Sequence, residues 1–91
     1  MQRKDEKTLY LRKIVGELIK ATRVNNTKLS ANKFSNEYDI GNGNMSRIEN
    51  GKVDCKFITL WKIAEALGMK PSEFVKLLEN KLGNNFKLID E

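Results

Sequence analysis

The side chains best suited to chemistry lie between positions 42 and 52, in the run NGNMSRIENGK. Its polar members ahead of the first carboxylate are Asn42, Asn44, Ser46 and Arg47. An Asn amide can donate to and accept from an adenine edge, and an Arg can donate twice to guanine. No acidic residue interrupts the run before Glu49, so a helix here would offer hydrogen-bonding groups to base edges. A solvated turn has the same composition, so this face alone favours DNA only weakly.

Basic side chains flank this run on both sides. Those before it, with no acid between Glu17 and Glu37, are Lys20, Arg23, Lys28 and Lys33, and those after it are Lys52 and Lys56. The chain has 17 Lys and Arg against 12 Asp and Glu, a formal charge of +5, and a pI near 9.4. Such a charge favours a polyanionic partner, and these lysines could contact phosphates on either side of a groove. An ordinary solvated surface explains the same pattern, and the residues leave both interpretations open.

The residue types exclude most catalytic and metal chemistry. The chain has no His and a single Cys, Cys55, so it lacks an imidazole base, a thiolate metal site and an internal disulfide. We therefore expect no enzyme activity, cofactor or metal, and we interpret Cys55 as a reduced side chain in a turn. The opening MQRKDEK lacks the apolar stretch of a signal peptide, and no window approaches 18 consecutive apolar residues. A cytoplasmic protein without membrane association is expected.

The spacing of apolar residues predicts an all-α fold. A chain of 91 residues, 40% of them hydrophobic, suits one domain spanning residues 1–91. Helical periodicity predicts five helices, at about residues 11–24, 31–38, 42–50, 57–67 and 71–82. Ser30 is suited to cap the second, Gly51 to end the third in the left-handed conformation, and Pro71 to open the fifth. The last eight residues, NNFKLIDE, fit a strand, a helix end or a frayed tail, and their state stays open.

The same spacing predicts which side chains form the core. The inward-facing residues expected are Ile14, Val15, Leu18, Ile19, Phe34, Ile40, Met45, Ile48, Phe57, Leu60, Trp61, Ala64, Leu67, Phe74, Leu77 and Leu78. We expect Trp61 to lie in the core rather than at an interface. Two short helices joined by a tight turn between residues 31 and 50 would then cross and expose the outer face of the second.

Two stretches resemble a known family. LSANKFSNEYDIGNGNMSRIENGK followed by LWKIAEALGMKPSEF is similar to the lambda-repressor-like helix-turn-helix (HTH) family, the phage repressor, Cro and Xre type of bacterial regulators. The most specific segments are SRIENGK at 46–52 and KIAEALGM at 62–69. The resemblance covers about residues 15–74 and implies a compact five-helix bundle containing an HTH, followed by an extension at 75–91.

The resemblance implies roles for particular residues. The helix at 31–38 would lie across the DNA backbone, and the helix at 42–50 would enter the major groove. Base reading would fall to Asn42, Gly43, Asn44, Ser46 and Arg47. We expect phosphate contacts from Lys28, Ser30, Asn32, Lys33, Asn50, Lys52 and Lys56. Arg23 and Glu49 match a buried salt bridge of the family, and a phosphate contact is the competing role for Arg23.

The chain departs from the family pattern at several places. Ala31 stands where a Gln is common, Ser35 where Ala is usual, Asp39 where the turn has Gly, and Gly41 where a capping Ser or Thr is found. Asp tolerates the left-handed conformation that this turn requires. Gly43 lies inside the third helix, and one extra residue separates Arg23 from Leu29.

These features predict a sequence-specific DNA-binding regulator, a repressor that binds a palindromic operator as a dimer. The C-terminal third supplies the expected dimer surface, through Phe74, Val75, Leu77, Leu78, Leu82, Phe86, Leu88 and Ile89. The alternative is an antitoxin of the same fold, whose main partner is a toxin protein and whose DNA binding regulates its own operon. A basic protein of membrane surfaces is the weakest hypothesis, because the apolar stripe of the first helix is needed for the core.

Overall fold

The computed structural model describes residues 3–89, and side chains within residues 6–41 and 43–89. Its helices are α1 (Arg3–Thr27), α2 (Ala31–Glu37), α3 (Asn42–Glu49), α4 (Phe57–Ala66) and α5 (Pro71–Leu82). No strand occurs in the described part of the chain. The all-α fold class with five helices is therefore confirmed.

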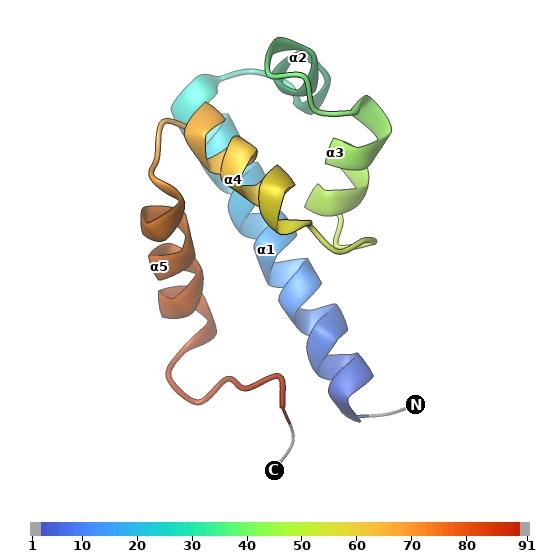
Figure 1. The fold of residues 1–91 in the computed structure, drawn as a ribbon, viewed down its shortest axis with the longest axis vertical. Helices are drawn as coiled ribbons and strands as arrows, with labels where there is room; N and C mark the ends of the chain where they lie inside the picture. Colours follow the sequence, from blue (N-terminus) through green and yellow to red (C-terminus); the bar gives the residue numbers. More distant parts are fainter. Residues whose placement is uncertain (1–2, 90–91) are drawn as a thin grey trace.

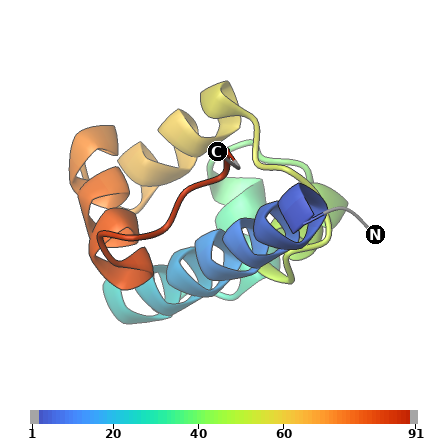
Figure 2. The same ribbon diagram turned by 90° about the horizontal axis from the view of Figure 1, so that it is seen from below.

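The long helix α1 is the support on which the other helices are arranged. It packs against α3, α5 and α2, while α2 packs on α3 and α4 packs on α5. In Figure 1 the α2–α3 pair lies at the upper end of the longest axis, and the segment after α5 lies at the lower end. That segment turns back from the end of α5 toward the N-terminal half of α1 (Figure 1 and Figure 2), where the ring centroids of Phe86 and Tyr10 lie 6.0 Å apart.

Local residue preferences explain several of the helix boundaries and the turn between α2 and α3. The Ser30 hydroxyl accepts from the backbone N–H of Lys33 at 3.1 Å, which satisfies a free donor in the first turn of α2. Gly51 has φ +71° and ends α3, as its residue type predicts. Asp39 has φ +56°, so it does adopt the left-handed conformation that the turn between α2 and α3 requires. Pro71 stands in the first turn of α5.

Every helix contributes side chains from one face to the hydrophobic core. Its buried apolar residues are Ile19, Phe34, Ile40, Met45, Ile48, Ile63, Ala64, Leu67 and Phe74, with Ile14 also buried on α1. On α4 the predictions of Ala64 and Leu67 as core residues are confirmed and Leu60 packs against the core, but Phe57 and Trp61 are exposed. The missed residue Ile63 is fully buried in their place. Leu77 on α5, like Phe57 and Trp61, is exposed.

Three further boundaries differ from the sequence prediction. Helix α1 begins at Arg3 rather than near Leu11 and continues past Val24 to Thr27. Lys28 has φ +63°, so the extra residue before Leu29 is accommodated by a left-handed turn. Residues 83–89 form neither helix nor strand, and residues 90–91 of the predicted extension lie outside the described residues.

Candidate nucleic-acid interface

Helix α3 presents one apolar and one polar face. Met45 and Ile48 are buried in the core, whereas Gly43, Asn44, Ser46 and Arg47 are exposed. Asn42 is the first residue of α3, but its side chain lies outside the described residues. The candidate base-reading residues that are described therefore lie together on the outer face of one helix.

The crossing of α2 and α3 is held by backbone bonds through the turn. The N–H of Ile40 donates to the carbonyl of Ser35 at 2.8 Å, and the N–H of Met45 donates to Gly41 at 2.9 Å. Ser35 is fully buried where the family has Ala, and its hydroxyl donates to the carbonyl of Asn32 at 3.0 Å. The extra polar atom is thus satisfied inside α2, so the substitution leaves no unpaired buried hydroxyl at this position.

The turn is also tied to α4. The Lys62 ammonium donates to the carbonyl oxygen of Asp39 at 3.2 Å. Because this residue has a left-handed backbone, its carbonyl is turned out of the helical ladder, and a cation from another helix satisfies it. The bond ties the turn that precedes α3 to α4.

Arg23 and Glu49 join α1 to the last turn of α3. The Arg23 Nε donates to Glu49 Oε2 at 2.7 Å and its Nη2 donates to Oε1 at 3.1 Å, which makes the pair bidentate. The remaining terminal nitrogen, Nη1, donates to the carbonyl of Leu29 at 2.6 Å. Both residues are buried, so Arg23 is not placed to contact a phosphate in this arrangement. The same pair turns the only carboxylate of α3 away from its outer face.

The close approach of α1 and α3 depends on Gly16, a residue that the sequence analysis missed. A Cβ at this position would lie 2.4 Å from the carbonyl oxygen of Ile48 and 2.5 Å from that of Glu49. Neither backbone atom can move without shifting α3, so a side chain at Gly16 is excluded sterically. The available signal was a Gly inside a strongly helical apolar stripe, where it lowers helix stability and needs a packing reason.

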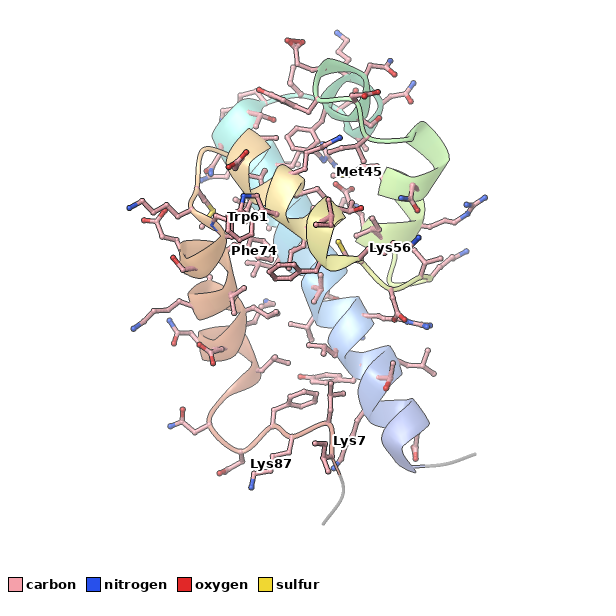
Figure 3. The ribbon with its side chains drawn as sticks, in the orientation of Figure 1. Lys7, Met45, Lys56, Trp61, Phe74 and Lys87 are labelled. Atoms are coloured by element: carbon pink, nitrogen blue, oxygen red, sulfur yellow. The ribbon has the colours of Figure 1, made fainter. Side chains whose placement is uncertain are left out.

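The candidate phosphate-binding residues fall into three groups. Ser30, Asn32 and Lys33 are exposed at the start of α2, and Asn50, Lys52 and Lys56 are exposed between α3 and α4. Figure 3 shows Lys56 on the side of the molecule where α3 lies. Lys28 is exposed in a shallow hollow that it shares with Glu17 and Lys20 of α1. The two groups beside α2 and α3 bracket the polar face, whereas Lys28 is grouped with α1.

The match to a known family covers the part of the chain that forms this arrangement. Residues 16–79 match the sequence profile of the Cro/C1-type HTH DNA-binding domain. The chain belongs to this family. No curated protein and no solved structure matches the chain. The Cro/C1-type domain identifies α2, the turn and α3 as the HTH, and the chain as a DNA-binding regulator.

Outside the polar face of α3, the described residues offer few groups suited to catalysis or metal binding. A cavity of about 400 Å³ lies between α1, α4, α5 and the tail, and its lining is mainly aliphatic. Cys55 borders it, and burial raises the pKa of this thiol to about 11. Among the described residues no group of His, Cys, Asp and Glu side chains is arranged to hold a metal ion. No helix within residues 3–89 is long and apolar enough to cross a membrane.

Proposed function

We propose that this protein is a sequence-specific transcriptional regulator, a repressor that works in the cytoplasm by occupying a palindromic operator as a dimer. The observation that supports this most is the outer face of α3. It exposes amide, hydroxyl and guanidinium groups, while its only carboxylate, Glu49, is buried against Arg23. A face of this kind can contact base edges without a carboxylate that would repel the DNA phosphates.

The width of an α-helix suits the major groove. A helix with its side chains is about 10–12 Å across, and the major groove is about 12 Å wide, so α3 with its eight residues can enter it. Arg47 is suited to a bidentate contact with guanine and Asn44 to adenine, with Asn42 and Ser46 as further readers. Gly43 adds no side chain, so the helix backbone can approach a base pair closely.

The flanking groups position the domain on the backbone. Lys33 at the start of α2 and Lys52 and Lys56 after α3 are exposed cations on the two sides of the reading face. Ser30, Asn32 and Asn50 add hydrogen-bonding groups beside them, and Lys28 extends the cationic surface along α1. Phosphate contacts of this kind set register and affinity, while the base contacts set sequence preference.

A domain with one short reading helix makes few base contacts, so two copies on a two-fold site double them. Within the predicted C-terminal dimer surface, Val75, Leu77, Leu88 and Ile89 are exposed, but Phe74 is fully buried and unavailable. Repression follows from occupancy, because a bound dimer blocks other proteins from the same stretch of DNA.

Selection of bound duplexes from a random oligonucleotide pool tests this proposal. We expect enrichment of a palindrome whose half-sites lie about one helical turn, 34–36 Å, apart. Enrichment of a single half-site would contradict the dimeric operator but keep the reading helix. A pool without any enrichment would contradict sequence-specific binding and favour the protein-binding, antitoxin-type alternative, for which capture of a partner from the native host is the direct test.

A further inference from the structure

Helix α4 carries an apolar surface that the core does not use. Phe57, Ile58 and Trp61 are 67%, 75% and 47% exposed, while Ile63, Ala64 and Leu67 of the same helix are buried. The rings of Phe57 and Trp61 lie edge to face with centroids 5.9 Å apart. The indole Nε1 donates to Glu65 Oε2 at 3.1 Å, so the one polar atom of this surface is satisfied within the helix. We name these three side chains the α4 patch.

We propose that the α4 patch is the surface through which two copies of this chain associate; this inference rests on the proposed function, which calls for a dimer. The three side chains leave roughly 400 Å² of apolar surface in water, taking about 200 Å² for each large side chain. This is about half of the 800 Å² that each partner contributes to a standard interface. The patch can therefore supply the centre of an interface whose rim comes from neighbouring residues.

The charge of the α4 patch favours a second copy over a charged partner. None of its three residues is ionisable, so two identical patches meet without like charges at the centre although each chain carries a formal charge of +5. Two lysines border the patch: Lys62 donates to the carbonyl of Asp39 in the turn before α3, and the exposed Lys56 occupies the N-cap position at the start of the helix. An isologous contact between identical apolar surfaces suits the two-fold symmetry of a homodimer.

The position of the α4 patch also suits two reading helices on one duplex. Helices that read successive major-groove turns lie about 34 Å apart, so each lies about 17 Å from the two-fold axis. The molecule measures 42 × 25 × 20 Å. Only its two shorter dimensions are close to the distance of about 17 Å between each reading helix and the two-fold axis. The tail after α5 lies at the far end of the longest axis from α2 (Figure 1), so pairing through it would separate the two α3 helices further. Figure 3 shows Trp61 on the side of α4 nearer α5.

Sedimentation velocity of the full chain over a range of concentrations tests this assignment. We expect a wild-type dimer, and Ile58→Glu should raise its dissociation constant about thirtyfold or more, as loss of a central contact does. Val24→Glu is the matched control, since Val24 is 51% exposed on α1 and the charge change is the same. Because Trp61 is the only Trp, its emission should shift to shorter wavelength as the wild-type chain dimerises.

Other outcomes assign the patch differently. A chain that is monomeric at every concentration overturns the second copy as occupant, and a dimer lost in Ile89→Glu but kept in Ile58→Glu moves the interface to the tail. Helical circular dichroism should match across the variants, because the changed residues lie outside the core. Binding to a single selected half-site separates the two proposals: a wild-type chain that is monomeric but binds the half-site contradicts only the interface, whereas failure of the wild-type chain to select any DNA contradicts the proposed function.

Discussion

Arg23 Nε and Glu49 Oε2 lie 2.7 Å apart in a bidentate ion pair that joins α1 to the last turn of α3. Both side chains are less than one-tenth exposed, so neither charge is solvated if the other is removed. The pair fixes the end of α3 against α1, the longest helix of the described residues. Its first consequence is for stability.

Glu49→Gln should destabilise the fold strongly, because it leaves the Arg23 guanidinium buried without a counter-charge. Loss of one partner of a buried pair costs about 3–5 kcal/mol, which for a domain of this size lowers the thermal midpoint by at least about 10 °C. The measurement is thermal unfolding by circular dichroism. Glu65→Gln is the control, since Glu65 is exposed and its carboxylate accepts a hydrogen bond from the Trp61 indole. Equal midpoints for the two variants would contradict a structural role for the pair.

Gly16→Ala should destabilise the protein even though Ala favours helices. The new Cβ would lie 2.4 Å from the carbonyl oxygen of Ile48, so α1 and α3 must separate. Overpacking of this kind costs about 1–3 kcal/mol or more. Gly43→Ala is the matched control in α3, where the nearest atom to a new Cβ is Arg47 Nη2 at 3.9 Å; it should stabilise by about 0.5–1 kcal/mol. Urea unfolding of both variants measures the effect, and a stabilised Gly16→Ala would refute the close approach.

Much of the HTH was predictable because its determinants are local. Ser30 caps α2 through its own hydroxyl, and Asp39 and Gly51 are residue types that tolerate a positive φ. Such preferences act within a few residues, so the sequence displays them directly. The Cro/C1-type family assignment likewise depends on short motifs at fixed spacing.

The register of α4 was not predictable in the same way. Apolar residues occupy so many positions of this helix that two stripes, one with Phe57 and Trp61 and one with Ile63, both fit helical spacing. Periodicity cannot choose between them, and packing against α5 decides in favour of the second stripe. The structure thereby exposes the pair of aromatic rings that the sequence placed in the core.

Two other features that the sequence did not predict depend on contacts between residues far apart in the chain. Gly16 is required by carbonyl groups more than thirty residues later, which no local pattern records. The path of the tail depends on Phe86 packing near Tyr10 at the other end of the chain. Propensity describes neither relationship, because both arise from tertiary packing.

Cys55 should react slowly with alkylating reagents in the folded protein. Burial raises the pKa of its thiol to about 11, because desolvation disfavours the thiolate. An unfolded chain has a thiol pKa near 8.5. At pH 8 the thiolate fraction of Cys55 should therefore be at least about 100-fold smaller in the folded protein than in the unfolded chain. Iodoacetamide modification followed by mass spectrometry should be correspondingly slower than in urea, and should accelerate as pH rises toward 11. Equal rates at pH 8 in both conditions would contradict this burial.

Binding to a selected operator should weaken steeply with salt. Lys28, Lys33, Lys52 and Lys56 are exposed cations proposed to neutralise phosphates. At about 0.9 per phosphate, the log–log slope of affinity against salt concentration should be about −3 to −4 per protomer. Fluorescence anisotropy at several salt concentrations measures it, with Lys76, exposed on α5, changed to Ala as the control that keeps the slope. A slope near zero would contradict phosphate contacts.

The most direct test of α3 as the reading helix compares Arg47→Ala with Lys52→Ala on the selected operator and all its single base-pair variants. Arg47→Ala should lose about 1–3 kcal/mol of discrimination at one base pair in each half-site and leave the other preferences intact. Lys52→Ala should weaken every sequence alike, because its partner is a phosphate. If Arg47→Ala weakens all sequences uniformly, or Lys52→Ala alone relaxes one position, α3 does not read the DNA through the face described.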